Sequence, residues 1–189
     1  MVRCYNRIVK VALSYLLVLS GAGLVGYAVA MVKAIHCDYP QVRFRIISAL
    51  RTQPWQAEIF TKTKPGSFFD GIHAAMKSAG STGLRDPVQL AQVTRPSYDA
   101  AVAPAKAHWK GIFSKFKMGG TAMIGGLIMA ITVHTSLLFH ILLLIAAVIA
   151  AIWMISTKTD CDRYGVLARH EILPEVDRAI AEGRYGKPS

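Results

Sequence analysis

The chain has 189 residues, of which 53% are hydrophobic, and a mean hydropathy of +0.36. This composition excludes a soluble domain with a single apolar helix and indicates a small integral membrane protein. In such a protein the formal charge of +11 reports topology and contact with anionic lipid before nucleic acid, so we expect no nucleic-acid partner.

The first predicted element is a membrane span over residues 11–32. These residues carry no charged side chain, and about 20 apolar residues suffice to cross a bilayer as a helix. The run is longer than the core of a signal peptide, so we expect residues 1–33 to form a retained N-terminal transmembrane helix. No acidic residue precedes Asp38, and such a basic, acid-free start also suits a protein imported into mitochondria.

Residues 34–117 are predicted to form a basic extramembrane segment with amphipathic helices. In residues 41–51, Val42, Ile46, Ile47 and Leu50 share one helical face, which predicts a helix that lies in the headgroup region and ends at Pro54.

The capping residues of this segment predict further helix boundaries. Ser67 followed by Asp70 indicates a helix start, with Gly80 as its end, and Asp86 before Pro87 indicates another start. The stretch around Pro96 is predicted to be a loop.

A further amphipathic helix leads into the second span, with its apolar residues at helical spacing and lysines beside them. Tryptophan and lysine at such a boundary are typical of headgroup contacts. We therefore predict contacts with lipid headgroups from seven residues of the segment. They are Arg43, Arg45, Arg51, Lys106, Trp109, Lys110 and Lys117.

Residues 118–157 contain no Asp, Glu, Lys or Arg and are too long for one ordinary span. The polar cluster at residues 132–136 favours a transmembrane hairpin over residues 118–156, with arms 118–133 and 137–156 and a turn at 134–136. The alternative is one long helix that projects beyond the bilayer. A hairpin places 19 Lys/Arg on one side and three on the other, which satisfies the positive-inside rule much better than two spans would.

Residues 157–189 form a polar tail, for which we predict a helix over 160–183, interrupted at Pro174 and closed by Gly183. The expected fold is therefore an all-α integral membrane protein with three transmembrane helices. The N-terminal helix comes first and the hairpin follows, with a helical basic segment between them and a helical tail after them.

Small residues recur at a spacing of four in all three predicted spans, which predicts close helix packing within the chain or with neighbouring subunits. The predicted packing residues are Ala22, Gly26 and Ala30 in the first span, Ala122, Gly126 and Ala130 in the second, and Ala147 and Ala151 in the third.

The sequence offers little chemistry. It contains no phosphate-binding loop, dinucleotide fingerprint, zinc-protease motif or nucleophile elbow, and the predicted spans contain no carboxylate for a proton relay. His134 and His140 are the only candidates for haem ligation, but six positions apart they do not share a helical face. We therefore expect no enzyme activity, no cofactor and no metal site.

The function predicted from these observations is that of a structural or accessory subunit of a multi-subunit membrane complex. A mitochondrial respiratory-chain or ATP synthase assembly in the inner membrane is the first choice, with other membrane subunits and an anionic, cardiolipin-like lipid as partners. The alternatives are an inner-membrane subunit of a bacterial secretion or conjugation system, and a haem- or quinone-associated membrane protein.

Overall fold

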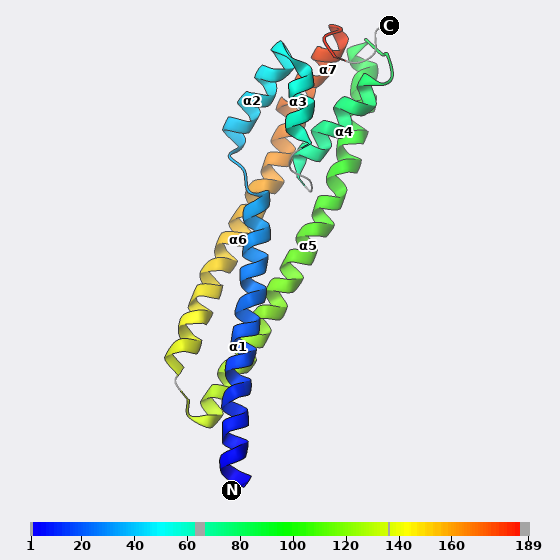
Figure 1. Ribbon diagram of the computed structural model, residues 1–189. Helices are drawn as coiled ribbons and strands as arrows, with labels where there is room; N and C mark the ends of the chain where they lie inside the picture. Colours follow the sequence, from blue (N-terminus) through cyan, green and yellow to red (C-terminus); the bar gives the residue numbers. More distant parts are fainter. Residues whose placement is uncertain (1, 63–66, 136, 186–189) are drawn as a thin grey trace. The chain divides into compact units, whose positions relative to one another are not determined.

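The computed structural model describes residues 2–62, 67–135 and 137–185, except for the side chains of residues 2–6, 105 and 106, and this part of the chain is all-helical. Three of its helices, α1, α5 and α6, are long and apolar enough to cross a membrane, which confirms the predicted class to that extent. Figure 1 shows the helices in order. They are α1 (Val2–Ile35), α2 (Tyr39–Thr52), α3 (Pro54–Thr61), α4 (Phe68–Gly80), α5 (Pro87–Val133), α6 (Leu137–Glu171) and α7 (Leu173–Ala181).

The chain divides into two compact units. Unit 1 comprises Met1–Ala34 and Trp109–Thr157, and unit 2 comprises Ile35–His108 and Lys158–Ser189. Helices α5 and α6 contribute to both units. The polar tail and most of the central segment therefore belong to one packed unit.

Unit 1 contains the predicted hairpin. Helix α5 ends at Val133 and α6 begins at Leu137, so the predicted turn between two helices is confirmed and the alternative of one long helix is wrong. His134 adopts a left-handed conformation with φ of 56°. The amide of Thr135 donates to the carbonyl of Ala130 at 3.1 Å, and that of His134 donates to the carbonyl of Ile131 at 3.3 Å. This is a Schellman cap with histidine where glycine usually stands. Ser136 lies outside the described residues.

Unit 2 has its own hydrophobic core, built from side chains of α2, α3, α4, α5, α6 and α7. Ile46 and Leu50 of α2 are completely buried in it, beside Phe69 and Ile72 of α4 and Val176 of α7. The prediction that this face of α2 lies in the headgroup region is therefore wrong. The apolar stripe does form one face of a helix, but that face meets protein.

The predicted end of α2 at Pro54 is confirmed, because α2 ends at Thr52, and Pro54 also opens α3, where a proline at the first helical position loses no hydrogen bond. The predicted loop around Pro96 is helical, because α5 runs without a break through Pro96 and Pro104. Leu90, Thr94 and Tyr98 are buried on one face of α5 while Pro96 is exposed, so tertiary packing compensates the hydrogen bond that proline removes.

The tail helix does not begin at residue 160 as predicted. Helix α6 continues from the apolar stretch to Glu171, and α7 follows with Pro174 in its first turn. The interruption near Pro174 is confirmed, and so is the end at Gly183, which has φ of +73° and completes a Schellman cap.

The predicted helix starts at Ser67 and Asp86 are confirmed as well, since their side chains accept hydrogen bonds from the amides of Phe69 and Val88.

Candidate functional surfaces

The buried residues of α1 recur in unit 1 at alternating spacings of four and three. They are Ser14, Val18, Gly21, Val25, Ala28 and Val32. The buried residues of the facing stretch of α5 follow the same rule, as Trp109, Ile112, Gly119, Met123, Gly126, Ala130 and Val133, with the half-buried Phe116 completing the series. A repeat of seven with two inward positions is typical of helices that pack as in a left-handed coiled coil. The buried positions at which α1 and α5 face each other, which we call the seam of unit 1, therefore follow a heptad repeat and not a spacing of four.

Helices α1 and α5 approach each other closely at Gly21 and Gly119. A Cβ atom on Gly21 would lie 2.5 Å from the carbonyl oxygen of Gly119, and one on Gly119 would lie 2.7 Å from the carbonyl oxygen of Gly21. Neither carbonyl can move without bending its helix, so only glycine fits at either position. Sequence reasoning missed this pair, although the heptad spacing in both helices would have found it.

The predicted packing residues fall into two groups. Gly126 and Ala130 of α5 and Ala147 of α6 are buried, while Ala122 and Ala151 are half-buried. In α1, by contrast, Gly26 and Ala30 are exposed and Ala22 is half-buried. No heavy atom lies within 4 Å of a Cβ placed on Gly26 or on the nearby Gly23. None of the described residues therefore covers the small-residue face of α1 at Gly23 and Gly26.

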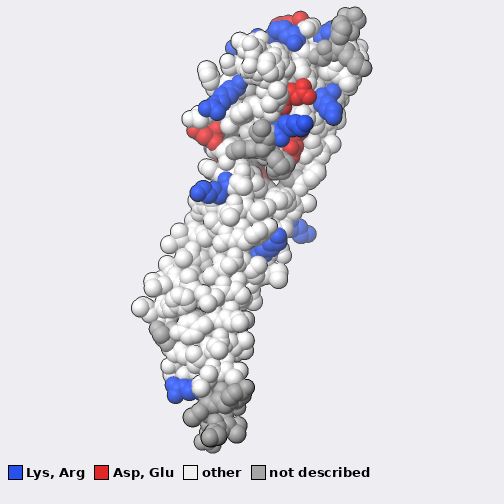
Figure 2. All heavy atoms as spheres, in the orientation of Figure 1, with Lys and Arg blue, Asp and Glu red and all other residues white. Residues whose placement is uncertain are grey.

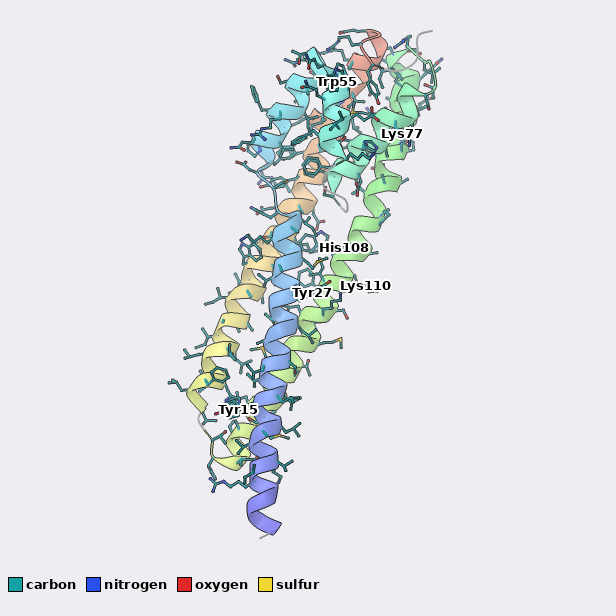
Figure 3. The ribbon with its side chains drawn as sticks, viewed as in Figure 1. Tyr15, Tyr27, Trp55, Lys77, His108 and Lys110 are labelled. Atoms are coloured by element: carbon teal, nitrogen blue, oxygen red, sulfur yellow. The ribbon has the colours of Figure 1, made fainter. Side chains whose placement is uncertain are left out.

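His140 is completely buried at the start of α6. Its Nε2 and the Oγ of Ser14 share a hydrogen bond of 2.9 Å, and its ring lies 5.1 Å from the ring of Tyr15, measured between centroids. Figure 3 labels Tyr15 on α1. A polar pair in an apolar bundle fixes the register of its helices, because a slip would leave both groups unsatisfied. Haem ligation through this nitrogen would require loss of the hydrogen bond to Ser14.

Two of the arginines predicted to contact lipid form ion pairs inside unit 2. Arg43 Nε lies 2.6 Å from Glu171, and Arg51 donates from Nη2 to Glu175 at 2.9 Å and from Nε at 3.3 Å. The hydrogen bond from Arg51 lowers the pKa of Glu175 below its ordinary value. These arginines, although exposed, therefore attach α2 to the end of α6 and the start of α7. Arg45 is also exposed but takes part in none of the ion pairs found among the described residues.

The remaining predicted headgroup residues lie on α5. Lys110 and Lys117 are exposed, and the Lys106 side chain lies outside the described part. Trp109 is only 4% exposed because it occupies the buried seam of α5, so its predicted role as a headgroup contact does not agree with the structure. Sequence reasoning missed Lys115, whose ammonium lies 4.5 Å from the ring centroid of Tyr27 and 3.5 Å from its hydroxyl.

The outer face of α2 and α3 carries large exposed apolar side chains. Phe44 is 75% exposed, and Trp55 (Figure 3) and Ile59 are also exposed. A shallow depression of about 380 Å³ lies beside Phe44, between Arg43 and Arg51. The inward face of α2 is occupied by the core of unit 2, so any contact that α2 makes with a partner uses this outer face.

The thiols of unit 2 are poorly placed for reaction. Cys37 is buried, and burial raises the pKa of Cys161 to about 11, with Cys37 and nearby aspartates adding to the effect. Within the described residues, no group of three or more His, Cys, Asp or Glu side chains is arranged to hold a metal ion.

Comparison of the chain with protein-family models, with curated proteins and with solved structures yields no match.

Proposed function

We propose that the protein is a non-catalytic accessory subunit of a multi-subunit membrane complex. The observation that carries this proposal is the uncovered small-residue face of α1, where Gly23 and Gly26 have open space beside them. Small residues in membrane helices allow another helix to approach closely, and van der Waals contact then replaces contact with lipid. Because the heptad seam of unit 1 does not use this face, a helix of another subunit is its natural occupant.

The outer face of α2 and α3 supports the same proposal outside the bilayer. Phe44 of α2 and Trp55 and Ile59 of α3 are each exposed, and exposed aromatic groups of this kind are enriched where proteins meet. Subunits of membrane assemblies commonly need contacts both within and beyond the membrane. The chain offers one candidate surface of each kind.

We further propose that the complex is a respiratory-chain or ATP synthase assembly of the mitochondrial inner membrane. The support is the basic, acid-free N-terminal stretch and the exposed lysines of unit 1, which suit an anionic lipid such as cardiolipin. A bacterial inner membrane also contains anionic lipid. The partners that purify with the protein distinguish the two locations.

The test is purification from native membrane in mild detergent, with identification of the proteins that remain bound. Gly26→Leu should release those partners, because the larger side chain keeps the neighbouring helix away. Gly125→Leu is the matched control, since Gly125 of α5 also has open space beside it but lies outside the α1 face. Retention of the same partners by Gly26→Leu, with wild-type thermal unfolding, would show that the face contacts only lipid.

A further inference from the structure

We infer that one end of unit 1 binds the headgroups of anionic phospholipids through Lys33 of α1 and Lys110, Lys115 and Lys117 of α5. All four lysines are exposed. The two stretches that form unit 1, residues 1–34 and 109–157, contain no Asp or Glu. On the face drawn in Figure 2, unit 1 accordingly shows basic but no acidic side chains. None of the ion pairs found among the described residues involves these lysines.

The register of α1 against α5 places the four lysines at one level. Gly21 faces Gly119, and Tyr27 faces Lys115, so the two helices run antiparallel. Lys33, six residues beyond Tyr27, is therefore level with Trp109 and Lys110. From Lys110 to Lys117 the helix rises by about 10 Å, a distance that flexible lysine side chains can cover within one headgroup layer.

Aromatic rings accompany the lysines at this level. Tyr27 of α1 is 47% exposed and Trp153 of α6 is 37% exposed. Met123 of α5 and Ala147 of α6 belong to one hydrophobic cluster. Lys117 lies six residues before Met123 and Trp153 six residues after Ala147. Because the two helices are antiparallel, Lys117 and Trp153 lie at the same level. Tyrosine and tryptophan are enriched at this depth, where their rings face hydrocarbon and their polar atoms face water. Figure 3 labels Tyr27 and Lys110 on the two neighbouring helices.

Tyr27 also holds Lys115 in position for an anion. The tyrosine ring attracts the ammonium through its π electrons, and the hydroxyl accepts from the ammonium. An ammonium has three N–H donors, so two remain for the oxygens of a lipid phosphate. An ordered cation loses less side-chain entropy on binding than a mobile one.

The arginines of α2 are less available to a lipid phosphate than these lysines. Arg43 and Arg51 already face Glu171 and Glu175, and a lipid phosphate would have to compete with those carboxylates. The lysines of unit 1 have no acidic neighbour within their unit. Charge complementarity therefore assigns the anionic headgroups to the lysines. The assignment rests on the membrane location in the proposed function, but not on any protein partner.

The experiment uses the full chain in mild detergent with added phosphatidylglycerol or phosphatidylcholine, and native mass spectrometry counts the retained lipids. The test variant replaces Lys33, Lys110, Lys115 and Lys117 by Gln. The control replaces four exposed cations of unit 2, Arg45, Lys62, Lys77 and Arg163, by Gln, which removes the same charge. We expect the preference for phosphatidylglycerol to fall about tenfold or more in the test variant, since each surface cation contributes severalfold, and to persist in the control.

Tyr27 provides a second arm. Tyr27→Leu should weaken the preference about as much as Lys115→Gln, whereas Tyr27→Phe, which keeps the ring, should retain most of it. An unchanged preference in the four-lysine variant, or an equal loss in the control, would overturn the assignment. If alkaline carbonate extracts the wild-type chain from membranes, the membrane location fails, and the proposed function fails with it. A membrane-embedded chain without lipid preference overturns the lipid site alone.

Discussion

At the residue scale, the difference between Gly21 and Gly23 shows why one glycine is required and another is not. Both lie in the middle of α1, and both would tolerate alanine in an isolated helix. Gly21 touches the backbone of Gly119, while Gly23 has open space beside it. A methyl group added at Gly21 meets a carbonyl oxygen that cannot move independently of its helix. The same methyl group added at Gly23 meets no atom of the described chain.

We therefore predict opposite effects for two identical substitutions. Gly21→Ala should destabilise the chain by about 1–3 kcal/mol through overpacking. Gly23→Ala should leave it unchanged or stabilise it by about 0.5–1 kcal/mol, because alanine loses less backbone entropy in a helix. Thermal unfolding in detergent, followed by circular dichroism, measures both. Equal melting temperatures would mean that α1 and α5 do not meet at this pair.

At the element scale, α2 is held to the end of the chain by charge as well as by its buried face. Arg51 of α2 donates to Glu175 of α7, and Arg184 donates to the carbonyl of Leu50 at 2.8 Å. The Glu175 side chain is mostly covered, with 14% of its surface exposed, while Arg51 is exposed. Because the arginine favours the charged carboxylate, the pKa of Glu175 is lowered from its ordinary value.

This lowered pKa predicts a pH dependence with a definite sign. The Arg51–Glu175 contribution is fully present above the ordinary pKa of a glutamate, about 4.3, and is lost as the pH falls through the lowered value. Glu175→Gln should therefore unfold at a lower temperature than wild type at neutral pH, and its melting temperature should fall less steeply on acidification.

A double-mutant cycle separates this pair from other carboxylates. Arg178 also lies 3.2 Å from Glu175, so Arg51→Gln should flatten the acid dependence only in part. The double variant should lose less stability than the sum of the two single variants, since Arg51 and Glu175 share one interaction. Thermal unfolding between neutral pH and about pH 3 supplies the data. Additive effects of the two substitutions would show that Glu175 does not act through Arg51.

At the scale of the whole molecule, all the acidic residues belong to unit 2, while the charged residues of unit 1 are all basic. A three-helix unit with a hairpin between α5 and α6 predicts that both halves of unit 2 lie on one side of the membrane and the hairpin turn on the other. The 19-to-3 distribution of Lys/Arg predicts that unit 2 remains on the side of synthesis or import.

Introduced cysteines test this topology better than the native thiols do, because Cys37 is buried and the pKa of Cys161 is raised to about 11. In a chain whose native cysteines are replaced by serine, Lys77→Cys and Glu182→Cys should react with an impermeant maleimide from one side. Thr132→Cys, at the hairpin, should react only from the other. All three positions are exposed, so detergent should make them equally reactive. Labelling of all three from one side in intact vesicles would contradict the three-span topology.

The sequence by itself determined the features that depend on neighbouring residues. The length of a stretch without charged residues identifies helices long enough to span a bilayer. The capping side chains of Ser67 and Asp86 accept hydrogen bonds from amides two residues further along the chain. The polar cluster located the hairpin turn, and Gly183 located the end of α7. Hydrogen bonds of this kind are local, so a sequence pattern is enough to predict them.

Only the tertiary structure decided which environment each apolar or charged face meets. The stripe with Ile46 and Leu50 is equally suited to lipid and to a protein core, because both are apolar, and its burial depends on α4 and α7. Arg43 and Arg51 find their carboxylates more than 120 residues away. Likewise, Gly21 requires glycine only because Gly119 lies against it. Sequence periodicity predicts that a face is apolar, but the arrangement of helices determines what covers it.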